Sequence, residues 1–218
     1  MAEASDPVDN QGSRPRKERK ENADRRRRQL LDAALRSIKQ HGLAKTTLAT
    51  VAQEAGLSQG VAVFYFKSKN SLLAETLRAH YAAYTETWQR ALEEAGADPL
   101  DRLQALIRAD FAPHVCSPEA LSIWFAFWGE QNFTPQYAEI SRDFDTLRTE
   151  AIRQAVADLF RGEDEATTDR ISDWIDSLTD GYWQYIHLFP GRLSPEAAIA
   201  STLAMITQLR RSHGHDID

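Results

Sequence analysis

Tryptophan and tyrosine side chains accompany carboxylates in the C-terminal half of this 218-residue chain. Trp124 and Trp128 have the spacing of residues on one helix face, and Trp174, Tyr182 and Tyr185 share a face of a later helix. Aromatic faces attract cations through the ring quadrupole, and a nearby carboxylate can offset the positive charge. The pattern therefore indicates a site for an organic cation, with packing in the core or an interface as the alternative for each aromatic residue.

Eight residues are expected to form this site, and they combine the aromatic side chains with nearby acids. They are Trp124, Trp128, Glu130, Asp143, Asp180, Tyr182, Trp183 and Tyr185. Asp145 is a further acid in the same stretch. Trp183 points away from the face that Tyr182 and Tyr185 share, and Gly181 leaves space for close packing or for a ligand.

The residues that could act as nucleophiles or metal ligands lack the partners that such chemistry needs. His114 lies two residues from Cys116, and residues with this spacing do not share a helix face. Cys116 is the single cysteine, which excludes a disulfide framework and a multi-cysteine metal site. His213 and His215 lie in a polar tail with weak metal-ligand spacing. The sequence therefore predicts no enzyme activity, no metal and no cofactor.

The charge of the chain is unevenly distributed. Residues 14–78 contain 15 Lys and Arg against 6 Asp and Glu, whereas residues 79–218 contain 11 against 23, so the net charges are +9 and −12. A basic region attached to an acidic body indicates a polyanionic partner for the basic part, with a solvated charged surface as the alternative.

The composition is that of an ordinary soluble protein, with 42% hydrophobic and 27% charged residues. No apolar run approaches the roughly 20 residues that span a bilayer, and residues 1–10 lack the basic and apolar stretches of a signal peptide. We therefore expect a cytoplasmic protein with no membrane partner.

Capping and turn residues divide the chain into helices. Four prolines directly follow a capping residue, which is a strong signal for a helix start, at Asp98-Pro99, Ser117-Pro118, Thr134-Pro135 and Ser194-Pro195. Apolar residues recur at helical spacing, and alternating strand patterns are absent. We expect an all-α protein with nine helices, over residues 23–41, 47–55, 58–65, 69–95, 99–112, 118–131, 135–161, 165–188 and 195–212. The first of these ends at Gly42, and residues 1–22 are expected to form a disordered basic arm.

The segment Leu48–Phe66 has the features of a helix-turn-helix. Ala52 allows two short helices to cross closely, Gly56 can adopt the left-handed conformation of the turn, and Ser58 can cap the second helix. Its outward residues can reach base edges and phosphates, and they are Gln59, Gly60, Val61, Phe64 and Tyr65. A plain helical hairpin inside a bundle is the alternative.

Around this motif the sequence resembles the TetR family of bacterial transcriptional regulators. The matching residues run from Lys45-Thr46-Thr47 through Ala55-Gly56-Leu57-Ser58-Gln59-Gly60 to Phe64-Tyr65-Phe66-Lys67-Ser68-Lys69-Asn70-Ser71-Leu72-Leu73. The resemblance implies a DNA-binding domain over residues 23–68 and a ligand-binding and dimerisation domain over residues 69–218. Many members carry tyrosine where this chain has Val63, so operator preference cannot be transferred.

The DNA-binding residues expected from the motif and the resemblance include Thr47 and Lys69, which match phosphate-holding positions of the family. The other positions are Ser58, Gln59, Gly60, Val61, Val63, Phe64 and Tyr65. Arg25, Arg26, Arg27 and Arg28 could reach phosphates or a flanking minor groove, with a solubilising run as the alternative.

A narrower resemblance is to the choline-responsive BetI repressors of glycine betaine synthesis. It rests on the run from Ala62 to Leu73, on Ile123-Trp124-Phe125-Ala126-Phe127-Trp128 and on Asp180-Gly181-Tyr182-Trp183. It implies choline as the effector and genes for choline uptake or glycine betaine synthesis as targets. Another cationic or aromatic ligand, a DNA-binding activator or architectural protein, and a helical binding protein without DNA activity remain alternatives.

The expected partners are double-stranded operator DNA, a small organic cation such as choline, and a second copy of the chain. A symmetric dimer presents two recognition helices to two half-sites. Helices 165–188 and 195–212 are expected to form the dimer. The last helix carries an apolar stripe of Ile199, Leu203, Ile206 and Leu209 and the small residues Ala197, Ala200 and Ala204. The alternative is that this helix only covers the core of the monomer.

Overall fold

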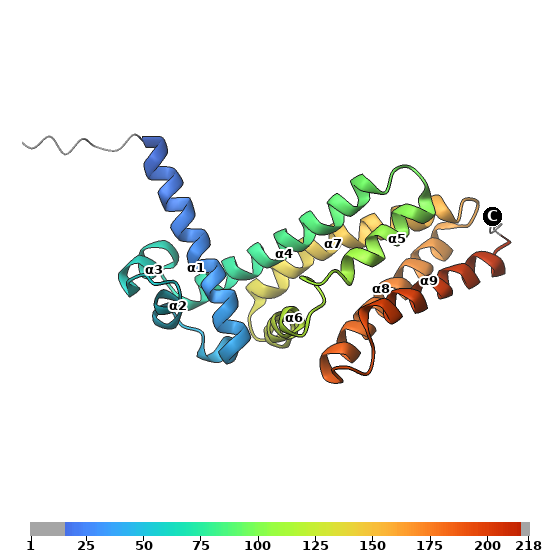
Figure 1. Cartoon of the computed structure of the whole chain (residues 1–218). Coiled ribbons are helices and arrows are strands. Elements are labelled where there is room, and N and C mark those ends of the chain that lie inside the picture. The colour runs from blue at the N-terminus through green and yellow to red at the C-terminus, as the bar shows by residue number, and fades with distance from the viewer. Residues whose placement is uncertain (1–15, 215–218) are drawn as a thin grey trace, which may run out of the picture.

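Nine α-helices make up the regular structure of residues 16–214, the part of the chain that the computed structural model describes (Figure 1). They are α1 (Arg16–Lys45), α2 (Leu48–Glu54), α3 (Gln59–Phe66), α4 (Lys69–Glu94), α5 (Pro99–Asp110), α6 (Pro118–Glu130), α7 (Pro135–Leu159), α8 (Glu165–Leu188) and α9 (Pro195–Ser212). The expected all-helical architecture of nine helices is confirmed. Over the described residues, no helix is both long and apolar enough to cross a membrane.

The four proline signals mark real helix starts. Pro99, Pro118, Pro135 and Pro195 are the first residues of α5, α6, α7 and α9. The side chains of Asp98, Ser117 and Ser194 accept hydrogen bonds from amides of the first turn, as predicted. Thr134 makes no such bond, so its expected capping role is wrong although the helix begins where predicted.

The first helix begins at Arg16, seven residues before the expected start at residue 23. Residues 16–22 are rich in arginine, lysine and glutamate, whose straight side chains lose little freedom in a helix, so helix propensity prevails over the lack of apolar residues. Residues 1–15 of the expected arm lie outside the described residues. At its other end, the helix is interrupted at Gly42 as expected, with φ +77° and ψ 168°.

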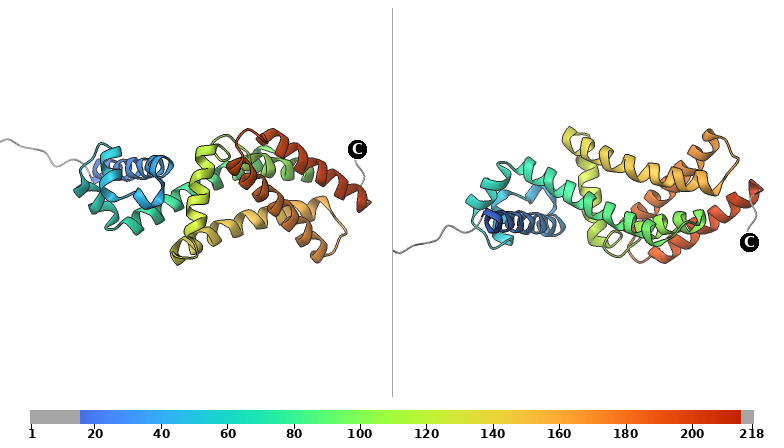
Figure 2. Two further views of the ribbon diagram at one scale, coloured as in Figure 1. Left: turned by 90° about the horizontal axis from the view of Figure 1, so that it is seen from below. Right: turned by 90° about the horizontal axis from the view of Figure 1, so that it is seen from above.

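Two hydrophobic clusters share the same two long helices. We call α1–α3 the head and α4–α9 the body. The head cluster contains Leu30 from α1 and Leu72 from α4, whereas the body cluster contains Ile38 from α1 and Leu77 from α4. The head therefore has continuous packing with the body rather than a flexible connection, and the two occupy opposite ends of an elongated molecule (Figure 2).

The turn between α2 and α3 depends on Gly56, which has φ +64°. The Leu57 amide donates to the Ala52 carbonyl (2.9 Å) and the Gly56 amide to the Gln53 carbonyl (3.0 Å), the hydrogen-bond pattern of a Schellman motif. Ala52 and Ala62 are both buried in the head cluster, so the two helices cross over small side chains as the sequence predicts.

Replacing Gly56 with alanine is expected to destabilise the protein by about 1–2 kcal/mol, because a Cβ atom is disfavoured in the left-handed conformation. Urea denaturation measures the change. Gly129 is a matched control, since it lies in α6 and a Cβ atom added there would meet nothing within 4 Å. There, alanine should add about 0.5–1 kcal/mol of stability. Equal shifts for both substitutions would contradict a special role for the Gly56 conformation.

Candidate nucleic-acid interface and ligand cavity

The helix α3 buries one face and exposes the other. Ala62 and Phe66 are fully buried in the head cluster, whereas Gln59, Val63 and Phe64 are exposed, Phe64 to 68%. An aromatic ring this exposed on a helix of eight residues is better explained by a partner surface than by folding. Val61 and Tyr65 are half-buried against the same cluster, so they contribute less to the outward face than the sequence suggests.

The turn residues at the starts of α2 and α3 differ in their capping. The Thr47 hydroxyl accepts a hydrogen bond from the Thr50 amide (3.1 Å), and the Thr50 hydroxyl accepts one from the Thr47 amide (2.9 Å), which forms a capping box. Ser58 precedes α3 but its side chain makes no capping hydrogen bond, so that expectation is wrong. Its hydroxyl is exposed beside Gln59 and Gly60 on the outward surface of the head.

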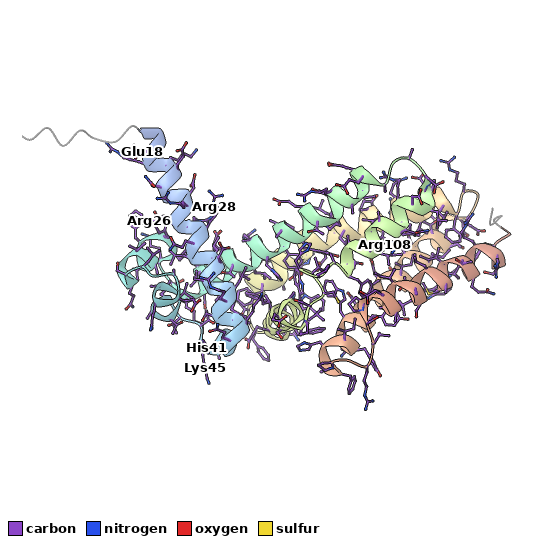
Figure 3. The ribbon with its side chains drawn as sticks, in the orientation of Figure 1. Glu18, Arg26, Arg28, His41, Lys45 and Arg108 are labelled. Carbon is purple, nitrogen blue, oxygen red and sulfur yellow. The ribbon has the colours of Figure 1, made fainter. Side chains whose placement is uncertain are left out.

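The four consecutive arginines of α1 point in different directions because successive helical residues are rotated by about 100°. Arg25 donates to the Asn22 side chain (2.6 Å). Arg26 lines a small hollow together with Tyr65 of α3, and it projects on the α3 side of α1, whereas Arg28 projects on the opposite side (Figure 3).

Two of the cations expected at DNA have partners within the fold. Arg27 donates to the Glu75 carboxylate of α4 (2.5 Å) and lies over the Phe66 ring (5.7 Å). The Lys69 ammonium donates to the Ala44 carbonyl (2.7 Å). Arg27 therefore joins α1 to α4 through a half-exposed ion pair, and its expected role in DNA binding stays a prediction. Lys69 keeps two further N–H donors, but its position is set by Ala44.

The body contains a cavity of about 210 Å³ that is lined by residues from five helices, α4 to α8. Its lining residues are Tyr84, Asp110, Trp124, Trp128, Asp145, Arg148, Thr149, Asp176, Thr179, Asp180 and Trp183. The indole rings form one wall, with centroids of Trp124 and Trp183 5.9 Å apart and those of Trp128 and Trp183 6.1 Å apart. The cavity therefore combines aromatic faces with carboxylates, which is the chemistry of a cation site.

Four of the eight residues expected at a cation site line this cavity, namely Trp124, Trp128, Asp180 and Trp183. The other four lie elsewhere. Glu130 and Asp143 are exposed on α6 and α7, Tyr182 packs against Phe111, and Tyr185 lies exposed beside Phe189.

Tyr182 and Tyr185 of α8 were expected at the cation site but do not line the cavity, because of the way α8 is rotated about its own axis. The cavity face has the spacing of residues 176, 179, 180 and 183, which puts Trp183 inside. Tyr182 and Tyr185 share the face that the spacing predicted, but that face does not line the cavity. Trp183 therefore lies on another face than Tyr182 and Tyr185, as the spacing predicts, and it is this face that lines the cavity. Periodicity alone does not say which aromatic face meets the neighbouring helices.

A buried ion pair forms the floor of the cavity, and the sequence alone did not predict it. Arg148 of α7 makes a short charge-assisted contact from Nη2 to Asp110 Oδ2 of α5, and its Nη1 donates to Asp176 of α8 (3.2 Å). The Tyr84 hydroxyl of α4 donates to Asp110 (2.6 Å) and accepts from Arg148 Nε (3.1 Å). The Trp183 indole N–H donates to the Asp110 backbone carbonyl (3.0 Å).

The sequence did contain a signal for this pair. Asp110 continues the apolar stripe of Leu103, Leu106 and Ile107 at helical spacing, and a charge at such a position requires a partner. The sequence could not identify that partner, because Arg148 lies 38 residues away in another helix.

The remaining carboxylates of the cavity carry unbalanced negative charge. Burial and the nearby Asp176 raise the pKa of both Asp145 and Asp180 to about 6, with Asp110 adding to the effect at Asp180. A carboxyl group whose pKa is raised in the folded state favours folding below about pH 4, and this contribution is lost as the pH rises through 6. At neutral pH both groups are therefore mainly ionised and add to the negative charge of the cavity. Arg148, the one cation in the lining, is already bonded to Asp110 and Asp176, so a bound cation would balance the charge of Asp145 and Asp180.

Comparison with known proteins gives matches over both parts of the chain. Residues 30–76 match the family described as bacterial regulatory proteins, tetR family, and residues 99–211 match the BetI-type transcriptional repressor C-terminal domain. The HTH-type transcriptional regulator BetI of Paraburkholderia xenovorans strain LB400 is 35% identical over 72% of this chain and 80% of its own length. The protein of the same name from Serratia proteamaculans strain 568 is 30% identical over 86% of this chain and 94% of its own length.

Solved structures with the same fold include two proposed transcriptional regulators. That of Pseudomonas aeruginosa PAO1 has a TM-score of 0.78 at 22% identity, covering 87% of this chain and 93% of its own. That of Saccharomonospora viridis, determined in complex with choline, has a TM-score of 0.74 at 22% identity, covering 84% and 96%.

Replacing Arg148 with methionine is expected to destabilise the protein by about 3–5 kcal/mol, because the Asp110 carboxylate would remain buried without its guanidinium partner. Urea denaturation measures this loss, and the additional substitution Asp110→Asn should restore part of it by removing the unpaired charge. Arg153→Met on the same helix is the control, since Arg153 pairs with Glu150 at the surface. A similar loss for both arginine variants would argue against a special contribution of the buried pair.

Proposed function

The chain belongs to the TetR family of bacterial transcriptional regulators and carries a BetI-type C-terminal domain, and on this basis we propose that it is a dimeric repressor that choline releases from its operator. It is a regulator and not an enzyme. Its proposed targets are genes for choline uptake or glycine betaine synthesis, and its proposed place of action is the cytoplasm, where bacterial operators lie.

The cavity carries the proposal for the ligand. A quaternary ammonium group cannot donate hydrogen bonds, so a site for it needs aromatic faces and negative charge rather than hydrogen-bond acceptors in fixed directions. Trp124, Trp128 and Trp183 supply the faces, and Asp145 and Asp180 supply charge that no cation of the lining balances. The choline complex of the Saccharomonospora viridis protein, which has the same fold, supports choline as the ligand.

The exposed face of α3 supports DNA binding by residues 23–68. Ser58, Gln59, Gly60, Val63 and Phe64 lie together on the outer surface of the head, where bases and phosphates can reach them. We keep further residues as proposed contributors from the rim of this surface, namely Thr47, Val61, Tyr65, Lys69, Arg25, Arg26, Arg27 and Arg28. The body, residues 69–218, is proposed to bind the ligand and to form the dimer.

The packing around Trp124 supports a coupling between ligand binding in the cavity and the position of the head. The Trp124 ring lines the cavity. Its centroid lies 4.1 Å from that of the His80 ring and 4.8 Å from that of the Tyr81 ring, both on α4. The helix α4 continues into the head cluster, and α6 packs against α1. A ligand that favours one position of Trp124 can therefore shift α4 and change the spacing of the two heads in a dimer, provided that it binds the two states with different affinity.

The test measures DNA binding by the full-length protein. The readout is the fluorescence anisotropy of a labelled duplex from the region upstream of its own gene. We expect binding that saturating choline weakens by about 5-fold or more, the lower end of typical allosteric coupling. Binding that choline leaves unchanged would overturn choline as the inducer and favour another cationic or aromatic ligand. Absence of binding to any duplex at low salt would overturn the DNA-binding function.

Two variants of α7 distinguish choline binding in the cavity from a general effect of surface charge in this experiment. Asp145→Asn removes a charge from the cavity and should raise the choline concentration needed for release, whereas Asp143→Asn removes an exposed charge outside it and should not. Release by choline should also weaken as the pH falls below 6, because protonation of Asp145 and Asp180 removes the charge that binds the cation. An identical response of both variants would contradict binding in this cavity.

The surfaces of α8 and α9 support dimerisation, but not through the stripe that the sequence suggested. Ile206 is buried and Ile199, Leu203 and Leu209 pack onto the core of the monomer, so this stripe covers the body. Exposed apolar side chains lie instead on α8, where Trp174 is 46% and Leu188 56% exposed. The small residues Ala197, Ala200 and Ala204 are exposed on α9. We assign the dimer interface to these exposed faces.

Leu188→Glu is expected to convert the dimer into a monomer, because two glutamates would face each other near the symmetry axis without a counter-ion. Sedimentation equilibrium should give about twice the chain mass of 24.6 kDa for the wild type and the chain mass itself for the variant. Phe133→Glu is the control, since Phe133 is 80% exposed in the turn between α6 and α7, away from the proposed interface. A dimeric Leu188 variant would contradict the assignment.

A further inference from the structure

The helix-turn-helix itself contains no positive charge. Residues 47–66 include no lysine or arginine and one acid, Glu54, whereas all six lysines of the chain lie between residues 17 and 69. Binding to a phosphate backbone depends on cations that displace its counter-ions. The cations that serve the recognition helix α3 must therefore come from the segments that flank it.

The first cation after α3 is Lys67, and its backbone is strained. It is the only non-glycine residue with a positive φ among residues 16–214, with φ +61° and ψ −42°. The Ser68 amide donates to the Phe66 carbonyl (2.6 Å), which closes a three-residue turn around Lys67. This is the rare γ-turn with positive φ, which is unfavourable for a residue with a Cβ atom and which glycine adopts without that cost.

The Lys67 side chain lies on the outward face of the recognition helix. Its position continues the helical spacing of Gly60, Val63 and Phe64, all of which are exposed. The Lys67 ammonium lies 5.3 Å from the centre of the Phe64 ring, so a cation–π interaction holds it over the end of this face. The side chain is exposed, and burial in the fold therefore gives no reason for a lysine at a position that suits glycine.

The neighbouring cations differ from Lys67 in having partners inside the fold. Lys69 donates to the Ala44 carbonyl, and Arg27 pairs with Glu75. The charge of Lys67 instead lies against an exposed aromatic ring on the surface that is proposed to face DNA. Strained residues of this kind are concentrated at functional sites, where the surrounding structure maintains an unfavourable conformation.

We propose that Lys67 binds a DNA phosphate at the C-terminal end of α3, and that the strained turn serves to direct its ammonium group onto the recognition face. This inference rests on the DNA-binding function proposed above and adds a residue to it. A phosphate contact acts on every sequence alike, so Lys67 should contribute to affinity and not to the choice of operator.

Three substitutions of Lys67 in the full-length protein separate charge from strain. Lys67→Gly removes both, Lys67→Gln removes the charge alone, and Lys67→Arg keeps both. Anisotropy is measured against the duplex from upstream of the gene and against a random-sequence duplex, at several salt concentrations. Thermal melting of each variant reports the strain. Arg108→Gln, which removes an exposed charge from α5 in the body, is the control.

We expect the Gly and Gln variants to bind both duplexes about tenfold more weakly at low salt, with a salt slope lower by about 1 for each protomer bound. Lys67→Gly should melt a few degrees above the wild type while binding DNA less well, a combination that a purely structural residue would not give. Lys67→Arg should retain most of the affinity, and the Arg108 control should be unchanged in binding.

Unchanged affinity and salt slope in both the Gly and Gln variants would overturn the proposal while leaving DNA binding intact. Weaker binding of the specific duplex alone would also overturn it, because that result indicates base recognition. Failure of the wild type to bind either duplex would overturn the DNA-binding function itself, and the role of Lys67 with it.

Discussion

The body of this regulator depends on one buried interaction, the ion pair between Arg148 and Asp110. The pair joins α7 to α5, and it extends to α8 through Asp176 and to α4 through the Tyr84 hydroxyl. A guanidinium group has its donors in one plane, so it holds its partners at defined angles and thereby sets the positions of four helices. The network also lines the cavity, to which it contributes Tyr84, Asp110, Arg148 and Asp176. Because Arg148 is neutralised by its own partners, the cavity keeps the negative charge of Asp145 and Asp180 for a ligand.

One of the helices that enclose the cavity, α4, also packs in the head, which carries the proposed DNA-binding surface. The helix α4 begins in the head cluster at Leu72 and contributes Tyr84 to the cavity. The helix α1 runs from the head cluster into the body cluster, where Ile38 packs. Since each of these helices packs in both clusters, the head and the body are not joined by a flexible linker that could absorb a displacement in the cavity.

The sequence predicted the local features of this protein well because capping and turn residues act on their immediate neighbours. Asp98, Ser117 and Ser194 mark helix starts, and Gly56 marks the turn of the helix-turn-helix, for reasons that need no information on tertiary structure. The start of α1 was missed because its first residues have good helix propensity but no apolar pattern. Most of the residues that line the cavity were missed because the rotation of α8 and the partner of Asp110 are set by contacts between helices distant in sequence. The strain at Lys67 is likewise absent from any pattern of residue types and is visible only in the backbone angles.

The separation of charge along the elongated molecule has a consequence for how its two partners approach it. The net charge is +9 over residues 14–78 and −12 over residues 79–218, and the described parts of these two segments lie toward opposite ends (Figure 2). Such a distribution gives the protein a large electric dipole moment, and the field of DNA turns this dipole so that the head leads during diffusion. The acidic end repels the phosphate backbone and attracts small cations. An anionic polymer and the proposed cationic ligand are thus drawn to opposite poles of one molecule, and neither has to displace the other on arrival.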